Sequence, residues 1–216
     1  MPKQRRAKGS PGSVDPPAVE LRSRRQALFD TAVDLIGRQG YRGTTLRDIA
    51  KEFGVTEPAV YYYFDTKEDL LFTIYQETLE VALRTARTIA GSDATPREKL
   101  RAVISQFAHL VVEDKMFAIF FREKDELSPE NWSKITSGER DFVATIASVI
   151  EAGIAAGAFR RFDPTVVTFG LLGMAAWLNR WYRPGGPHSL DEIVETYYEI
   201  MVAGLQSGEL HQAAIT

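Results

Sequence analysis

Residues 44–70 constrain the fold more than any other part of the chain, because they predict two short helices joined by a tight turn. Thr45 and Asp48 have the spacing of a capping box, so a helix is expected to begin directly after Thr45. Gly54 ends that helix, since glycine adopts the left-handed C-cap conformation at little cost. Helices this short are unstable alone. Their arrangement matches a helix-turn-helix, in which the second helix enters the DNA major groove.

The second helix is predicted to be about two turns long, ending at Tyr63 or Phe64. Thr56 can cap it, and a proline follows in its first turn, where a missing N–H costs nothing. Val60 and Phe64 are four residues apart and are expected to pack inward. Three consecutive tyrosines cannot all be buried on so short a helix, so at least one phenol is expected to be exposed. Such a phenol can donate to a phosphate or contact a thymine methyl group.

The same stretch resembles the DNA-binding domain of TetR-family transcriptional regulators. The matching elements are Gly40-Tyr41, Gly43-Thr44-Thr45, Ile49-Ala50, Gly54-Val55-Thr56, Val60-Tyr61-Tyr62-Tyr63-Phe64 and Lys67-Glu68-Asp69-Leu70-Leu71. The resemblance implies seven DNA contacts, at Thr45, Arg47, Thr56, Glu57, Tyr62, Tyr63 and Lys67. The alternative for each residue is a capping or core role, and Thr45 and Thr56 are expected to cap in either case.

Two positions depart from the usual pattern of this family. Tyr63 stands where a histidine is frequent, and Glu57 stands where a small or basic residue is more usual. A carboxylate disfavours phosphate and favours a base-edge donor such as the cytosine N4 amino group. The operator sequence therefore stays open.

The net charge of the whole chain, −3, is unusual for a DNA-binding protein, but the two parts of the chain differ in charge. Residues 1–70 carry 12 basic and 10 acidic residues, a net +2, whereas residues 71–216 carry 14 and 19, a net −5. The acidic excess is therefore expected to lie away from the DNA. The chain of 216 residues has no cysteine, which excludes disulfides and thiolate chemistry and suits a cytoplasmic protein.

Residues 1–19 are rich in proline and poor in apolar side chains, so we expect a disordered basic arm. No apolar segment follows its charges, so it is not predicted to be a signal peptide. The arm either follows DNA phosphates or is a solvated tail. The first helix is expected over residues 20–39, with Arg22, Arg24 and Arg25 at its start. These arginines either face phosphates or form a solvated face.

The remaining pattern predicts an all-α protein of about nine helices with no convincing strand. A long helix from the Thr66–Asp69 capping box to about Ala90 would link head and body. Thr95–Glu98 and Ser189–Glu192 are expected to open two further helices. We expect a three-helix DNA-binding head in residues 20–66 and a larger ligand-binding and dimerisation body in residues 67–216.

Residues 165–179 contain no charge over 15 positions, which is too short to span a bilayer, since a spanning helix needs about 20 residues. We therefore expect a helix buried on most sides. Gly170 and Gly173 permit close helix approach, as do Ala203 and Gly204 in the last helix. We expect a homodimer in which the last two helices form a four-helix bundle with their symmetry mates. The alternative is that they form the core of a monomer.

The body is rich in aromatic residues, which form either a core or the wall of a cavity. The family resemblance favours a cavity for an apolar ligand. The candidate pocket residues are Phe107, His109, Phe117, Phe120, Phe121, Arg122, Arg140, Phe142, Trp177, Arg180 and Trp181. The arginines either bind a carboxylate or phosphate at the pocket mouth or form surface ion pairs. Residues 181–187 resemble a segment of repressors of fatty-acid and steroid catabolism, which respond to acyl-CoA thioesters.

An enzyme is the more distant alternative. His109 and Glu113 have i, i+4 spacing, but no third ligand for a metal has suitable spacing, and no phosphate-binding loop or hydrolase motif occurs. We therefore predict no catalysis, no cofactor and no metal. The sequence predicts a ligand-responsive transcriptional regulator, a repressor released from its operator by a small hydrophobic effector. An activator or a ligand-insensitive DNA-binding protein is the alternative.

Overall fold

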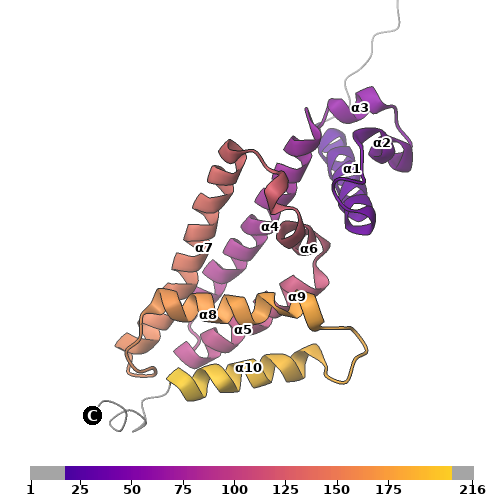
Figure 1. The fold of residues 1–216 in the computed structure, drawn as a ribbon. Coiled ribbons are helices and arrows are strands. Elements are labelled where there is room, and N and C mark those ends of the chain that lie inside the picture. The colour runs from indigo at the N-terminus through magenta and orange to yellow at the C-terminus, as the bar shows by residue number, and fades with distance from the viewer. Residues whose placement is uncertain (1–17, 206–216) are drawn as a thin grey trace, which may run out of the picture.

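The computed structural model describes residues 18–205, and within this range the chain is all-α. A small head lies at one end of the molecule, and the long helix α4 runs from it into a larger helical body (Figure 1). Most of the predicted basic arm, residues 1–17, lies outside the described residues. No helix of residues 18–205 is long and apolar enough to cross a membrane.

The head consists of α1 (Ala18–Gln39), α2 (Leu46–Phe53) and α3 (Glu57–Tyr61). The predicted capping box opens α2, and Gly54 closes it with φ +79°. Two details of α3 differ from the prediction. The helix ends at Tyr61, and the side chain of Thr56 stands at the N-cap without making a capping hydrogen bond. Beyond the helix end, the Val60 carbonyl accepts from the N–H groups of both Tyr63 and Phe64, at 2.9 and 3.1 Å.

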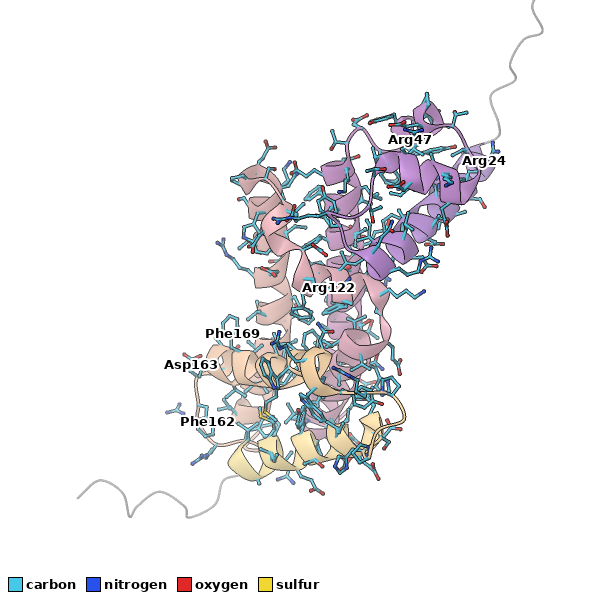
Figure 2. All side chains as sticks on the ribbon, turned by 45° about the vertical axis from the view of Figure 1, so that its right-hand side comes forward. Arg24, Arg47, Arg122, Phe162, Asp163 and Phe169 are labelled. Atoms are coloured by element: carbon cyan, nitrogen blue, oxygen red, sulfur yellow. The ribbon has the colours of Figure 1, made fainter. Side chains whose placement is uncertain are left out.

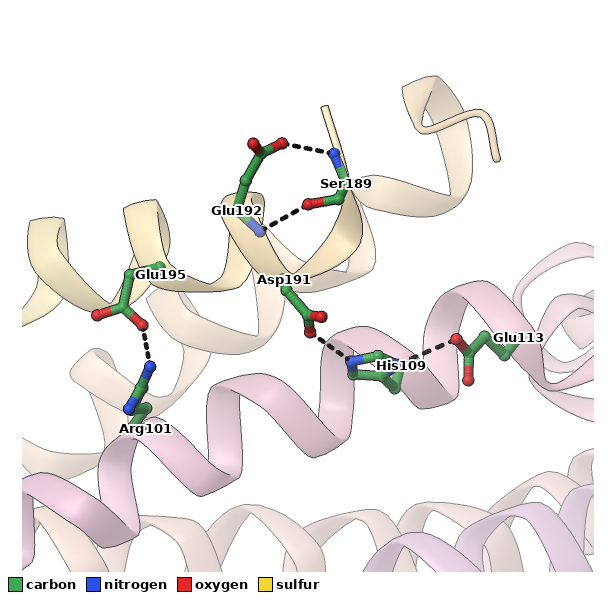
Figure 3. Close-up of polar contacts among 7 residues, drawn as sticks. All are labelled: Arg101, His109, Glu113, Ser189, Asp191, Glu192 and Glu195. Carbon is green, nitrogen blue, oxygen red and sulfur yellow. Dashed lines mark hydrogen bonds and ion pairs between the residues drawn. The ribbon is translucent and has the colours of Figure 1, made fainter. Parts of the chain in front are cut away.

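The body contains the remaining helices, whose predicted starts are confirmed at α4, α5 and α10. They are α4 (Lys67–Ala90), α5 (Pro96–Glu113), α6 (Lys115–Arg122), the 3-10 turn η1 (Lys124–Glu126), α7 (Pro129–Ala155), α8 (Pro164–Ala176), α9 (Leu178–Trp181) and α10 (Leu190–Leu205). Helices α8 and α10 lie together at the end of the body far from the head (Figure 1). An Arg101–Glu195 ion pair and a contact of 3.4 Å between His109 Nε2 and Asp191 Oδ1 join α10 to α5 (Figure 3).

The buried apolar side chains form two clusters rather than one. The first lies within the body and draws on α4, α5, α7, α8 and α10. The second is the core of the head, but it also contains Ile119 of α6, Leu127, and Ile135 of α7. The head is therefore completed by body residues that are distant in sequence.

Helix α8 is less covered within one chain than its uncharged sequence predicted. Thr168, Leu171 and Ala175 are buried. In contrast, Val166 is 68% exposed, Phe169 is 59% exposed, and Trp177 at the helix end is 60% exposed. These three side chains recur at helical spacing and therefore share one face. The absence of charge in α8 thus marks an apolar face that the single chain leaves uncovered.

Candidate DNA-binding surface and ligand cavity

The residues predicted to contact DNA lie on α2, α3 and the start of α4. Arg24 and Arg47 mark the end of the head that lies away from the body (Figure 2). Thr45, Arg47 and Thr56 are exposed, whereas Glu57 and Tyr63 are half-buried. The inward packing of Val60 and Phe64 is confirmed, because both side chains are buried. This burial turns the opposite side of α3 toward solvent.

An exposed phenol is present, as the tyrosine run predicted. Tyr62 is 72% exposed and Tyr61 is 47% exposed. The Tyr62 ring meets the Tyr63 ring edge-on, with their centroids 5.1 Å apart. Tyr63 thus supports the more exposed ring, whose hydroxyl is free to reach a phosphate or a base edge.

The start of α2 is fixed by reciprocal hydrogen bonds. The Asp48 N–H donates to Thr45 Oγ1 at 3.1 Å, and the Thr45 N–H donates to Asp48 Oδ2 at 2.9 Å. The bonds from Thr45 hold the pKa of the Asp48 carboxyl below its usual range. This capping box gives the helix a rigid first turn at the surface where DNA contact is predicted.

Lys67 is held differently from the other predicted contacts. Its Nζ lies 3.9 Å from the centroid of the Tyr41 ring, a cation–π contact. Burial lowers the pKa of Lys67, and the carboxylates of Glu126 and Glu123 oppose that shift. Burial also raises the pKa of the Tyr41 phenol to about 12. Lys67 therefore points into the junction of head and body, and a phosphate contact requires another side-chain conformation.

The three arginines predicted at the start of α1 do not act alike. Arg22, Arg24 and Arg25 are all exposed. The Arg25 guanidinium lies 5.2 Å from the centroid of the Phe64 ring. Arg25 thus packs on an aromatic ring three residues beyond the end of α3.

The body contains a cavity of about 680 Å³ between α4, α5, α6, α7 and α8. This volume falls within the range of small-molecule sites, roughly 300–1,000 Å³. Six of the predicted pocket residues line it: Phe107, Phe117, Phe120, Phe121, Arg140 and Phe142. Phe117 is central, with its ring centroid 5.6 Å from that of Phe107 and 5.9 Å from that of Phe120. The wall therefore combines phenylalanine rings with small and aliphatic side chains, and Arg140 and Glu139 are its charged residues.

The other five predicted pocket residues do not line this cavity. Arg122 lines a small hollow between α1 and α6, because one residue past Phe121 the helix has turned about 100°. Trp177 and Trp181 are exposed, and the Arg180 guanidinium lies 5.7 Å from the Trp177 ring centroid. His109 lines a separate cavity of about 330 Å³. Its Nδ1 lies 3.1 Å from Glu113, and its Nε2 lies 3.4 Å from Asp191 (Figure 3).

Several lining residues were absent from the predicted site. They come from α4, α7 and α8, and the set is Thr78, Leu79, Ala82, Thr136, Glu139, Val143, Ala144, Thr165, Phe169, Leu172, Gly173 and Ala176. Most are small or aliphatic and look like ordinary core residues in the sequence. Phe169 is the aromatic residue among them, and its place in the uncharged stretch 165–179 is the one signal in the sequence that could have marked it. Among the described residues, no group of three acidic or histidine side chains is placed to hold a metal ion.

Comparison with known proteins identifies relatives over most of the chain. The repressor KstR2 of Rhodococcus jostii (strain RHA1), an HTH-type transcriptional repressor, is 31% identical over 187 residues, which cover 85% of this chain and 92% of KstR2. The crystal structure of AibR with isovaleryl coenzyme A and operator DNA has 28% identity and a TM-score of 0.74, covering 82% of this chain and 97% of AibR. The structure of Mycobacterium tuberculosis KstR2 has 26% identity and a TM-score of 0.74, covering 86% of this chain and 96% of the KstR2 chain.

Two family profiles match the two parts of the chain. Residues 28–74 match the profile of bacterial regulatory proteins of the tetR family. Residues 93–205 match the tetracyclin repressor-like C-terminal domain. The first match contains the helix-turn-helix, and the second contains most of the cavity wall. The chain therefore belongs to the tetR family of bacterial regulatory proteins.

Proposed function

We propose that this protein is a homodimeric repressor that leaves its operator when a small apolar effector fills the cavity in its body. The observation that carries the proposal is the aromatic cavity of about 680 Å³ in a body joined to a helix-turn-helix head. An effector acts only if it binds the released form more tightly than the DNA-bound form. Since the target is chromosomal DNA, we place the protein in the cytoplasm.

We assign DNA binding to residues 20–66 and effector binding and dimerisation to residues 67–216. The exposed side chains of Arg47 and Tyr62 would contact phosphates or base edges, and the Thr45 cap would hold α2 against the backbone. Glu57 lies in a surface hollow with Thr45 and Arg47. In that place, its carboxylate favours cytosine over phosphate.

We assign the dimer interface to α8 and α10. Val166, Phe169 and Trp177 expose one apolar face of α8, and Ile200 of α10 is 56% exposed. Apart from the backbone of its own helix, a methyl group at Gly170 or Gly173 would meet no atom of the described chain within 4 Å. A partner helix can therefore approach there closely. A two-fold dimer would place the two heads about one DNA turn, roughly 34 Å, apart.

We propose that the effector is an acyl-CoA thioester whose acyl part enters the cavity. A wall with six phenylalanines suits an apolar acyl group, and Arg140, which lines the cavity beside Glu139, can pair with an anionic or polar part of the effector. AibR has been crystallised with isovaleryl coenzyme A and operator DNA, and KstR2 is the relative with 31% identity. Phe169 and Gly173 belong both to the cavity wall and to the exposed side of α8, so effector binding and dimerisation share this helix.

The test begins with selection of genomic DNA fragments by the purified protein. Release of the selected fragment is then measured against coenzyme A and a series of its thioesters with acyl groups of increasing size. Val143 lines the cavity, so a tryptophan in its place would fill part of the cavity volume. Val143→Trp should therefore abolish the response to thioesters while leaving DNA binding intact. Ser148→Trp, at an exposed position on the same helix, is the matched control. Selection of no fragment would refute DNA regulation, and an equal response of Val143→Trp would refute the cavity as the effector site.

A second candidate is a regulator that stays on DNA with its effector bound. The AibR structure holds isovaleryl coenzyme A and operator DNA together, and this observation favours it. The same titration separates the two, because a thioester that stabilises the protein thermally without releasing DNA supports the second candidate.

A further inference from the structure

The head contacts the body through the segment from α6 to the start of α7, residues 115–135, and the proposed function does not yet give this contact a role. We call this contact the head–body seam. Its apolar part places Ile119, Leu127 and Ile135 in the buried core of the head. Its polar part consists of contacts between residues about 80 positions apart in sequence. A core shared in this way ties the head to α6 as well as to α4.

Two carboxylates of the segment hold the turn between α1 and α2. Glu126 Oε1 accepts from Nε of Arg42 at 2.6 Å, and Glu123 Oε1 accepts from the N–H of Tyr41 at 3.3 Å. The turn that they hold leads directly into the capping box of α2 at Thr45. A shift of either carboxylate would therefore move the first turn of α2, where DNA contact is predicted.

Three further contacts fix the segment itself. Lys115 Nζ lies 2.6 Å from Asp34 Oδ1 of α1. At the other end, Glu68 Oε1 accepts from the Ser128 N–H at 2.9 Å and from Asn131 Nδ2 at 2.8 Å. These bonds tie the start of α4 to the start of α7. The seam thus connects α1 to α6 at one end and α4 to α7 at the other.

The other side of the same segment lines the cavity. Phe117, Phe120 and Phe121 of α6 are cavity residues, and the Phe120 carbonyl accepts from the Tyr75 hydroxyl of α4 at 2.9 Å. Figure 2 shows Arg122, at the end of α6, midway between the head and the lower body. Helix α6 therefore touches both the effector site and the core of the head.

We infer that Glu123 and Glu126 are positioning residues for DNA binding, which set the orientation of the head through Tyr41 and Arg42. This inference rests on the proposed DNA-binding function and adds a second connection beside α4. Neither carboxylate needs to touch DNA. Loss of their charges should let the head adopt several orientations and weaken operator binding.

The first measurement needs no DNA and uses the absence of native cysteine. Lys51→Cys on the head and Ser148→Cys on α7, both exposed positions, carry spin labels, and pulsed electron resonance gives their distance distribution. Glu123→Gln with Glu126→Gln should broaden it. Glu130→Gln is the matched control, because Glu130 pairs with Lys134 within its own helix α7, at 2.9 Å. Arg42→Glu with Glu126→Arg should restore the narrow distribution that Glu126→Arg alone loses.

The second measurement is affinity for the genomic fragment selected by the unmodified protein. Exposed ion pairs contribute about 0.2–1 kcal/mol, so neutralising the seam should weaken binding by roughly 1.4- to 5-fold for each head. Removal of two negative charges without a positioning effect would instead strengthen binding to DNA. An unchanged distance distribution, or stronger binding by the double variant, would overturn the inference. Failure to select any fragment would refute the DNA-binding function and leave the distance test standing.

Discussion

Replacement of Trp177 by alanine should weaken the dimer strongly while leaving the single chain intact. The indole stands at the end of α8 and is 60% exposed in one chain. An aromatic side chain carries roughly 200 Å² of surface, so about 120 Å² is available to a partner. At about 25 cal/mol per Å², covering it contributes up to about 3 kcal/mol per chain.

Both copies in a two-fold dimer lose this contribution, so the upper bound for Trp177→Ala is about 6 kcal/mol, or about four decades in the dissociation constant. An estimate from buried area exceeds the true free energy of association, because the loss of translational, rotational and side-chain freedom on binding opposes it. We therefore expect at least a hundredfold increase, about 2.7 kcal/mol. Unfolding of the monomer should change little, because the deleted surface is exposed.

Sedimentation equilibrium across a concentration series measures this effect directly. Tyr62→Ala is the matched control, because it removes an aromatic residue that is 72% exposed on the head. It should leave the dimer unchanged and weaken DNA binding instead. A Trp177→Ala protein that dimerises as tightly as the unmodified protein would refute α8 as the interface.

Three further predictions concern stability. Gly138→Ala should destabilise the protein by about 1–3 kcal/mol in denaturant unfolding, because its Cβ would lie 2.4 Å from a Leu79 methyl carbon; unchanged stability would mean that the Leu79 side chain can move aside into the cavity that it lines. Thr45→Ala removes the cap of α2 and should cost about 1 kcal/mol by the same measurement, more than Thr56→Ala, whose side chain makes no capping bond. The neutral, buried phenol of Tyr41 should contribute its full stability to the fold below pH 10, the pKa of an unfolded tyrosine. That contribution should be lost as the pH rises through about 12, the pKa of Tyr41 in the folded protein. Alkaline unfolding should therefore shift to higher pH in Tyr41→Phe.

Local signals predicted the helix starts well, because caps act within four residues. Thr66, Thr95 and Ser189 each accept a hydrogen bond from the N–H three positions on, at the start of α4, α5 and α10. The end of α3 was harder to predict, since it depends on how Phe64 enters the core. The same limit applies to Arg122, whose direction depends on the phase of α6 rather than on its neighbours in sequence.

Six of the eleven predicted pocket residues line the cavity, and the other five do not, because packing rather than residue type decides which aromatic residues reach it. Aromatic residues mark a cavity or a core equally well, and only packing separates them. Phe117 lines the cavity, whereas Trp181, which is equally aromatic, lies 42% exposed on α9. The shared core of head and body had no sequence signal at all. Ile119 and Ile135 look like ordinary apolar positions of α6 and α7, and their contact with the head is long-range.

Helix α6 offers a final contrast between two adjacent phenylalanines that both line the cavity. Phe120 also packs against the core of the head, and its carbonyl is bonded to Tyr75. Phe121 is 38% exposed. Phe120→Ala should therefore lower stability, by up to about 3 kcal/mol, and weaken DNA binding together with the effector response. Phe121→Ala should change the effector response with little effect on either of the other two.

Thermal unfolding, DNA titration and thioester titration on the two variants measure these three quantities. Equal losses of DNA affinity in both would mean that α6 moves as one rigid body with the head. A loss confined to Phe120→Ala would mean that one side of α6 serves the effector and the adjoining side serves the head. The second result is expected, because successive residues of a helix point about 100° apart and so contact different neighbours.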